Sequence, residues 1–282
     1  MTIAYHYCDQ PAFHAICSSR TLRFSDLHFM NDCMELTWAN RILGTAAVAL
    51  EKREPNVEFD IEPHVRIAAA LDSFKAKCVP TAFCLSKKRD QLSQWRGYAD
   101  DGKGFAIGFD LDVLKQLPAS QVELEYDEGN QQAVAAKFLE SFVEQHDKLT
   151  NEEVRQRCHD LYLLLAKFKQ PSFVEEAEVR LLHVLERRNS DGAIKILPTD
   201  CFAFGKKAVS PDVQFRMKAG APVPFVDIPF QENDSQSPLK EVMLGPMNFT
   251  RAESVEQFLT TIGYDAVSVS RSASSYRNPE TF

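Results

Sequence analysis

The hydrophobic positions of the chain switch repeatedly between the two-residue period of a strand and the 3.6-residue period of a helix. The clearest strand is the apolar run of residues 104–110, which lies between turn residues. Residues 121–127 alternate, and we expect them to pair with this run. In chain order, strands are expected at residues 3–8, 21–26, 78–86, 104–110, 121–127, 176–186, 201–204, 213–217, 223–228, 239–245 and 266–272.

The helical segments carry start signals as well as periodicity. Asp9 is a predicted N-cap, with Pro11 in the first turn of its helix. Thr150 and Glu153 fit a capping box, so a long helical block is expected to divide there into two helices. Helices are therefore predicted from residue 9, after Asn31-Asp32, near residues 62–77, at 91–99, twice within 131–169, and at 252–262.

The order of these elements indicates the fold class. Helices and strands alternate irregularly, without the strand–helix–strand rhythm of a doubly wound parallel sheet. We expect a single α+β domain over residues 1–282, with a mixed, mostly antiparallel sheet and helices inserted between its strands. Residues 115–169 are expected to form a mostly helical insertion within that domain.

Composition narrows the class of protein. The 282 residues carry a net charge of −8, which argues against non-specific binding to nucleic acid through charge. Seven cysteines without a Cys-x-x-Cys pair argue against a disulfide framework and against a zinc knuckle. No signal peptide and no apolar run of membrane-spanning length is found, so we expect a soluble, cytoplasmic protein. The usual phosphate-loop, dinucleotide-binding, nucleophile-elbow and zinc-protease motifs are missing from the sequence.

Two residues near the N-terminus are candidates for ligand binding. His6 lies between two tyrosines on a predicted strand, so its ring faces opposite to theirs and toward a cleft or solvent. A lone strand histidine is more often a hydrogen-bonded structural residue. Arg23, on the next predicted strand, needs a carboxylate or phosphate partner, and a salt bridge to a nearby acid is an equal alternative.

A second candidate region joins aromatic residues to a glycine-containing turn. Trp95 and Tyr98 are three residues apart, so they share a helix face on which a planar ring could stack. Gly102 and Gly104 follow, and their small size would let backbone N–H groups approach a ligand. The alternative is a core aromatic pair followed by an ordinary turn into a strand.

A third candidate region is charged. Glu176, Glu178 and Arg180 alternate along a predicted strand and are expected to project from one face. Such a run is most often an exposed face. It can also form the wall of a pocket in which one carboxylate accepts hydrogen bonds and the arginine fixes its neighbour.

Five segments together point to a known family. They are YHYC (5–8), LRFSDLHFMNDCME (22–35), WRGYADDGKGFAIGFD (95–110), EEAEVRLL (175–182) and VSVSRSASSYR (267–277). In this order they resemble a widespread bacterial family of unknown function whose members are often associated with abortive infection and phage defence. This chain has Cys33 where that family usually has proline, and Gly102 where it often has histidine.

That family is in turn similar to ADP-ribosyltransferase-like folds. Those enzymes use an early-strand histidine to hold the ribose of NAD, an aromatic side chain against nicotinamide, and a late-strand glutamate, often preceded by a second acid. The resemblance implies NAD as the substrate and these roles for His6, for Tyr98 or Trp95, and for Glu178 with Glu176. An arginine such as Arg23 would bind the pyrophosphate.

Three hypotheses about function follow. The leading one is an NAD-dependent ADP-ribosyltransferase or NAD-cleaving enzyme in phage defence, with an unknown acceptor. The rival is a non-catalytic sensor or partner-binding module of a defence system, which would dock a partner protein on the acidic strand. The third is an enzyme acting on another nucleotide, with Glu176, Glu178 and Asp32 as metal ligands.

Overall fold

A computed structural model describes most of the chain: residues 2–30, 35–53, 68–69, 71–73, 75–145, 148–190, 192–232 and 236–276. The strands are β1 (Ile3–Cys8), β2 (Thr21–Asp26), β3 (Cys78–Ser86), β4 (Phe105–Asp110), β5 (Ser120–Glu123), β6 (Glu178–Ser190), β7 (Ala193–Leu197), β8 (Asp200–Ala203), β9 (Lys206–Val209), β10 (Gln214–Lys218), β11 (Ala221–Pro229), β12 (Leu239–Leu244) and β13 (Ser268–Arg271).

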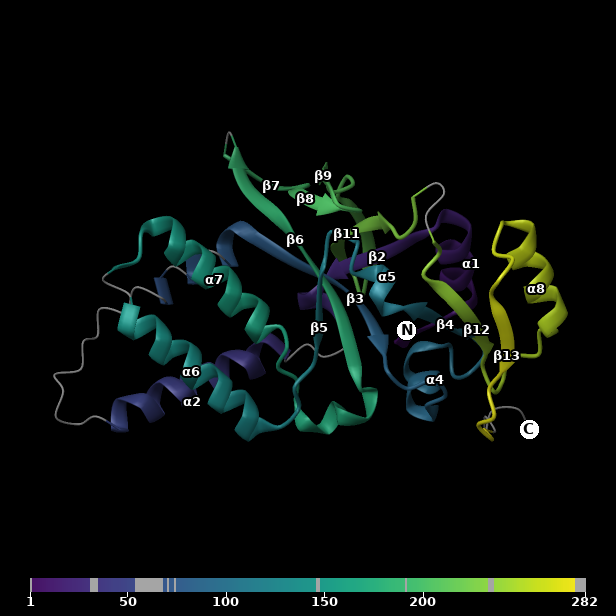
Figure 1. Ribbon diagram of the computed structural model, residues 1–282, viewed down its shortest axis with the longest axis horizontal. Helices are drawn as coiled ribbons and strands as arrows, with labels where there is room; N and C mark the ends of the chain where they lie inside the picture. Colours follow the sequence, from purple (N-terminus) through teal and green to yellow (C-terminus); the bar gives the residue numbers. More distant parts are fainter. Residues whose placement is uncertain are drawn as a thin grey trace.

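Helices lie on both sides of these strands in Figure 1. The α-helices are α1 (Gln10–Ser19), α2 (Glu35–Arg53), α4 (Leu92–Tyr98), α5 (Leu111–Leu114), α6 (Glu128–Gln145), α7 (Asn151–Leu165) and α8 (Ala252–Thr261), and the short 3₁₀ helices are η1 (Leu27–Phe29) and η3 (Pro171–Glu176).

The large sheet contains eleven strands, and β8 and β9 form a separate pair. Its order is β10-β11-β2-β3-β1-β4-β12-β13, with β6 on the other side of β3 and β5 and β7 paired to β6. All of its pairings are antiparallel except β12 with β13. The predicted fold class, α+β with a mixed and mostly antiparallel sheet, is therefore confirmed.

The first strand–helix–strand unit follows the local signals of its sequence. The side chain of Asp9 accepts a hydrogen bond of 2.8 Å from the N–H of Ala12, which caps α1 at its start. Arg20 then adopts a left-handed conformation, with φ of 54°, and ends the helix. The chain can therefore turn directly from α1 into β2.

A fork in the sheet is the feature that positions the site. β3 pairs with β6 along its whole length, from Cys78 opposite Glu186 to Ser86 opposite Glu178. On its other side, β3 pairs with β1 only at Ser86, and with β2 only at Thr81 and Ala82, near its middle. β1 and β2 therefore diverge from β3 in different directions, and α1 joins them across the opening.

One predicted pairing is wrong. Residues 121–127 were expected to pair with 104–110, but β5 pairs with β6, with Val122 opposite Arg180. β4 instead lies between β1 and β12. All six residues of β4 are buried, as its apolar run predicts. The strands β7 and β9 were not predicted from the sequence.

Helices α2, α6 and α7 gather on one side of the sheet (Figure 1) and share a hydrophobic core that includes Ile42, Phe142 and Leu161. The predicted capping box is present: Thr150 accepts from the N–H of Glu153, and the Glu153 carboxylate accepts from the N–H of Thr150. Residues 115–169 contain α6 and α7, whereas α2 reaches the same core from an earlier part of the chain.

Some predictions fall where nothing is described. Asn31, Asp32 and Cys33 lie outside the described residues, as does half of the helix expected near 62–77, whose described residues are helical. Within the described ranges, no helix combines the length and the apolar character that crossing a membrane requires.

Candidate functional site

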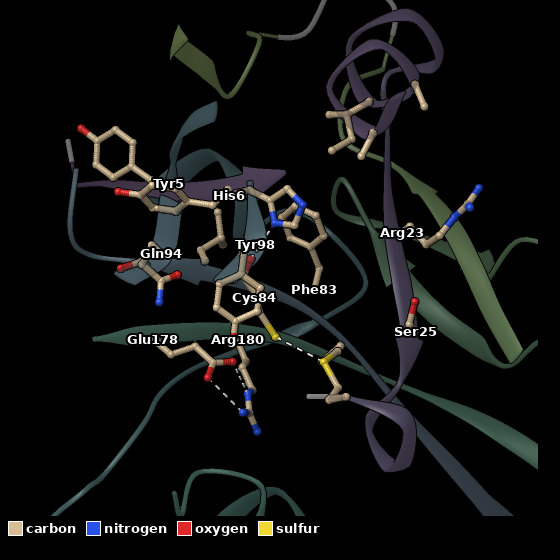
Figure 2. Close-up of a pocket in the computed structure, with 18 of the residues that line it drawn as sticks. Tyr5, His6, Arg23, Ser25, Phe83, Cys84, Gln94, Tyr98, Glu178 and Arg180 are labelled. Atoms are coloured by element: carbon tan, nitrogen blue, oxygen red, sulfur yellow. Dashed lines mark hydrogen bonds and ion pairs between the residues drawn. The ribbon is translucent and has the colours of Figure 1, made fainter. Parts of the chain in front are cut away.

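A cavity of about 700 Å³ opens at the fork, with β3 along its floor (Figure 2). One wall comes from β1 and α4, and the other from β2, β10 and the end of α1. Five of the predicted site residues line it: His6, Arg23, Tyr98, Glu176 and Glu178. Trp95 is not among the lining residues.

His6 occupies the fork itself. Its ring stacks on Phe83 with centroids 4.3 Å apart, and its Nδ1 lies 2.9 Å from the carbonyl oxygen of Cys84. Because a carbonyl oxygen only accepts, Nδ1 carries the proton and Nε2 is left with a lone pair. Burial lowers the pKa of His6, so the ring is neutral at pH 7.

The strand register separates His6 from the acidic residues. Tyr5 lies opposite Ser86, which lies opposite Glu178, so these three side chains share one face of the sheet. His6 leaves β1 on the other side of the pleat, as the alternation with the tyrosines predicts. The imidazole and the Glu178 carboxylate therefore line one cavity from different directions rather than forming a contact pair.

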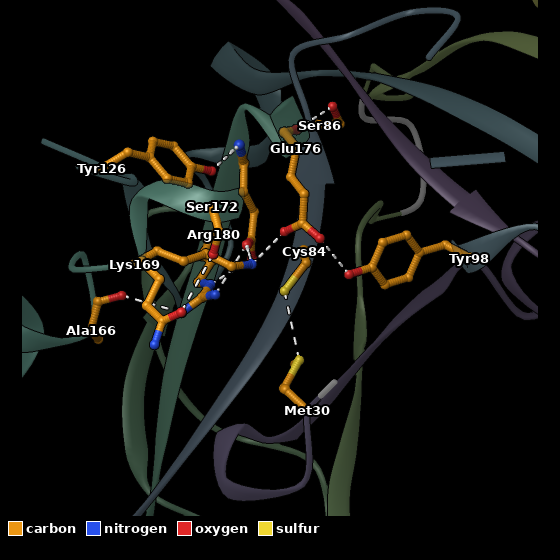
Figure 3. Close-up of polar contacts among 12 residues, drawn as sticks. Met30, Cys84, Ser86, Tyr98, Tyr126, Ala166, Lys169, Ser172, Glu176 and Arg180 are labelled. Carbon is orange, nitrogen blue, oxygen red and sulfur yellow. Dashed lines mark hydrogen bonds and ion pairs between the residues drawn. The ribbon is translucent and has the colours of Figure 1, made fainter. Parts of the chain in front are cut away.

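The acidic end of the cavity is a buried ion-pair cluster (Figure 3). Arg180 donates to both oxygens of Glu178, through Nε at 2.5 Å and a terminal nitrogen at 3.0 Å. Lys169 donates to Glu178 at 2.6 Å and also to Glu176. Glu178 is 6% exposed and Arg180 is 1% exposed, so an exposed strand face, the commonest explanation for such a run, does not apply here.

The charges in this cluster stabilise one another. Burial by itself favours the protonated form of Glu178, but Arg180 and Lys169 outweigh it and lower the pKa of the carboxyl to about 2. Burial likewise opposes the charge on Lys169, and the nearby Glu178 and Glu176 carboxylates outweigh it and raise the pKa of the ammonium group. At pH 7 the cluster therefore holds the Glu178 carboxylate between two cations, in a space from which water is largely excluded.

Glu176 does not lie on the strand, contrary to the prediction from alternation. It is the last residue of η3, and Ala177 follows in a left-handed conformation, with φ of 43°, before β6 begins at Glu178. The carboxylate of Glu176 nevertheless reaches the cavity. It accepts a hydrogen bond of 2.7 Å from the hydroxyl of Tyr98, and Lys169 donates to its other oxygen.

The cluster also contains residues that the sequence did not single out. Lys169 follows α7 in a loop, and no motif marks it. The thiol of Cys84 lies 3.8 Å from the sulfur of Met30 on the cavity floor. Burial and the neighbouring Glu178 raise the pKa of Cys84 well above its usual value, so this side chain is a neutral thiol at pH 7. Tyr126 supports the cluster from behind, because its hydroxyl accepts from the N–H of Glu178 at 2.9 Å.

Trp95 is part of the core beneath the cavity. It is fully buried, lies edge-on to Tyr7 with centroids 4.8 Å apart, and donates from its indole nitrogen to Asp90. This matches the alternative of a core aromatic. Tyr98, three residues later, is the member of the pair that lines the cavity.

The glycine-containing turn serves packing rather than ligand approach. The N–H of Gly102 donates to the carbonyl of Trp95, and the N–H of Gly104 donates to that of Ala99. A Cβ atom at Gly104 would overlap the carbonyl oxygen of Cys8. Gly104 is therefore required where the turn crosses the end of β1, and its backbone N–H is already occupied.

The opposite end of the cavity is cationic. Arg23 forms a two-bond ion pair with Asp227 at 2.9 and 2.8 Å and lies over the ring of Phe225. This is the salt-bridge alternative for Arg23, although the residue also lines the cavity. Two further cations, Arg216 and Lys218, reach the same space from β10.

Residues 94–181 match the model of a family described as "Protein of unknown function (DUF2971)". The matched segment runs from α4 to the start of β6, so it contains Tyr98, Lys169, Glu176, Glu178 and Arg180 but not the β1 and β2 walls of the cavity. No curated protein and no solved structure matches the chain.

The metal hypothesis requires a cluster of ligand side chains. Across the ranges that the structure describes, no group of three or more histidine, cysteine, aspartate and glutamate side chains is arranged to hold a metal ion. Asp32, the third residue of the metal hypothesis, lies outside those ranges.

Proposed function

We propose that the protein binds NAD in the cavity at the fork and cleaves the bond between nicotinamide and ribose. The observation that carries this proposal is that His6, Tyr98, Glu176 and Glu178, far apart in sequence, line a single cavity of about 700 Å³. That volume lies within the range of cavities that bury small-molecule ligands. Cationic side chains at one end and carboxylates at the other suit a ligand with phosphates at one end and a developing positive charge at the other.

The chemistry assigned to the acidic end is group transfer. The bond between C1′ of the ribose and the ring nitrogen of nicotinamide breaks, and its electron pair leaves with nicotinamide. The sugar carbon becomes positively charged, and a fixed carboxylate stabilises it where water is excluded. Water or an acceptor hydroxyl or amine then attacks C1′ and releases its proton, so that ADP-ribose or an ADP-ribosylated acceptor is formed.

Glu176 is the carboxylate best placed for this role. Glu178 accepts two bonds from Arg180 and one from Lys169, so its charge is closely matched by two cations. Among the described residues, Glu176 accepts side-chain hydrogen bonds from Tyr98 and Lys169 only, and its side chain is more exposed than that of Glu178, at 12% against 7%. We assign Glu178 to holding Lys169 and the strand end in place, and Glu176 to facing the ribose.

The ion pairs of Glu178 also favour a second candidate function. A carboxylate whose oxygens are already occupied stabilises a new positive charge weakly, because the neighbouring cations oppose it. The same cavity could then hold a nucleotide without cleaving it. This is a sensor module, which would pass ligand binding on to a defence-system partner protein.

Nicotinamide release from NAD tests the proposal. The purified protein is incubated with NAD, and free nicotinamide is measured for the wild type and for Glu176→Gln, with Glu186→Gln as the control. Glu186 lies on β6 and pairs with Arg188 at the surface, so it carries the same charge as Glu176 without lining the cavity. Release that is lost in Glu176→Gln and retained in the control supports the proposal.

Two other results would overturn it. Release at wild-type rate from Glu176→Gln removes the assigned role of that carboxylate. NAD that raises the melting temperature without any nicotinamide release supports the sensor instead. Melting curves of each variant without ligand separate loss of activity from loss of folding.

A further inference from the structure

We infer that Arg216, Lys218 and Ser25 form an anion site that takes the phosphate groups of the ligand. The inference deepens the proposed function, since a dinucleotide is the ligand only if that function is right. The anion site itself does not depend on cleavage. It transfers the phosphate-binding role from Arg23, the arginine suggested by the sequence, to two cations of β10.

The strand register brings these residues to one face. Ser25 lies opposite Phe225 on β11, and Phe225 lies opposite Gln214 on β10. Arg216 is two residues beyond Gln214, so it projects from the same face. Ser25 also lies opposite Ala82 on β3, so this face continues into the cavity floor. Arg216 donates a hydrogen bond of 3.2 Å to the Ser25 hydroxyl, so the two side chains are in direct contact.

The charges at this end do not balance. Arg23 and Asp227 neutralise each other through their two-bond ion pair. Among the described residues, no carboxylate lies within salt-bridge distance of Arg216 or Lys218. Lys218 donates to a neutral group, the carbonyl oxygen of Phe29, at 2.7 Å. Two positive charges therefore face the cavity without a matched anion in that part of the chain.

Their mutual position is unfavourable without a ligand. Burial and the like charge of Arg216 lower the pKa of Lys218. An anion held between the two groups would reverse this, because opposite charge favours the ammonium form. The lowered pKa is a consequence of the geometry and agrees with a site that is completed by an anion.

The hairpin holds the two cations in place. β10 and β11 are joined at Ala219 and Gly220, which both have positive φ values, 50° and 81°. Such a turn connects two strands tightly and fixes their register. Arg216 and Lys218 are thereby held two residues apart on the cavity face, with Val223 opposite Arg216 and Ala221 opposite Lys218.

These donors fit a phosphate or diphosphate. A guanidinium group offers paired N–H donors to phosphate oxygens, an ammonium group adds a compact charge, and a hydroxyl adds a neutral donor. Two unmatched positive charges also correspond to the two negative charges of a diphosphate bridge. A monocarboxylate would neutralise only one of them.

Binding of inorganic pyrophosphate and of ADP tests the inference. Both are titrated into the full-length protein by calorimetry at low and high salt, with wild type, Arg216→Gln, Lys218→Gln and the double variant. The control is Arg188→Gln, which removes a surface arginine outside the cavity. We expect each single substitution to weaken pyrophosphate binding roughly tenfold, and the double variant to weaken it further.

The outcomes are separable from those of the cleavage test. Pyrophosphate that binds the double variant as tightly as wild type overturns the anion site, whatever NAD does. Pyrophosphate binding that is lost in the double variant but kept in Glu176→Gln supports the anion site. If Glu176→Gln also still releases nicotinamide, the anion site stands and the role assigned to the Glu176 carboxylate fails. Arg216→Lys keeps the charge but loses the paired N–H donors. We expect this variant to fold and to bind pyrophosphate with an affinity between those of wild type and Arg216→Gln.

Discussion

The hydroxyl of Tyr98 donates a hydrogen bond of 2.7 Å to the carboxylate of Glu176, and so joins α4 to the turn that precedes β6. Burial, together with the negative charge of Glu176, raises the pKa of Tyr98, so the hydroxyl keeps its proton at neutral pH. The bond fixes the orientation of the carboxylate that we place beside the ribose. Among the described residues, it is the one side-chain hydrogen bond between Tyr98 and η3.

Removing this hydroxyl should affect the site more than the fold. We expect Tyr98→Phe to lower the free energy of unfolding by about 1 kcal/mol, the net contribution of one hydrogen bond, and to reduce nicotinamide release. Tyr276→Phe is the control, since Tyr276 makes a similar bond of 2.7 Å to Asp101 outside the cavity. Equal loss of activity in the two variants would show that Tyr98 has no special role.

The two glutamate–arginine pairs of β6 should differ in energy. Arg180 is buried with Glu178, whereas Arg188 and Glu186 form the same two-residue spacing at the surface. Arg180→Gln leaves a buried carboxylate without its main partner and should destabilise the fold by about 3–5 kcal/mol. Arg188→Gln should leave the stability almost unchanged, because solvent screens this exposed pair. Urea denaturation measures both, and similar values would mean that the Glu178 cluster is hydrated.

Acid should destabilise the protein through Glu178. The pKa of this carboxyl falls from its ordinary 4.5 to about 2 in the folded state, so the unfolded chain binds protons first. The stabilisation is complete above pH 4.5 and is lost as the pH falls from 4.5 toward 2. Urea midpoints measured across this range should fall for wild type. Glu178→Gln should flatten that fall and Glu186→Gln should not.

His6 gives a separate pH dependence. Because burial lowers its pKa below 6.5, the folded state disfavours the imidazolium. The contribution of the neutral His6 ring to the free energy of unfolding is complete above pH 6.5 and decreases as the pH falls below that value. His6→Gln should remove the His6 contribution to the fall in stability below pH 6.5, and leave the Glu178 part unchanged. A profile that is the same for wild type and variant in this interval would contradict a buried neutral His6.

The two glycines around Tyr98 make a sharp comparison. Gly104→Ala places a methyl group on the Cys8 carbonyl, where backbone meets backbone and neither can move freely. We expect loss of more than about 3 kcal/mol or failure to fold. Gly97→Ala, in the helix α4 with nothing within 4 Å, should stabilise by about 0.5–1 kcal/mol. Thermal melting of both variants decides the comparison.

The sequence predicted the strands and helices far better than their partners. Capping at Asp9 and Thr150 is encoded within a few residues, and both caps are present. Alternation predicts a strand at residues 121–127, and the observed strand β5 covers only Ser120–Glu123. Alternation also does not say which strand lies alongside, and β5 pairs with β6. Glu176 was placed on the strand because alternation continued through it, whereas Ala177 turns the backbone there.

The candidate site was predicted in part for the same reason. His6, Tyr98 and Glu178 follow from types of residue in chain order, and they line one cavity. Lys169 could not be found, because its meaning depends on two carboxylates that only the tertiary fold brings to it. Arg216 and Lys218 alternate on an exposed edge strand, and nothing local distinguishes them from solvated charges.

The divergence of β1 and β2 leaves Phe83–Leu85 with a strand neighbour, β6, on one side only. The main chain of these three residues therefore borders the cavity as an internal sheet edge, with its carbonyl at Cys84 already in use by His6. Backbone N–H and C=O groups bind a ligand through the geometry of the peptide, which a side-chain substitution does not change. A protein with the same fork but different lining side chains would present the same main-chain surface to the cavity.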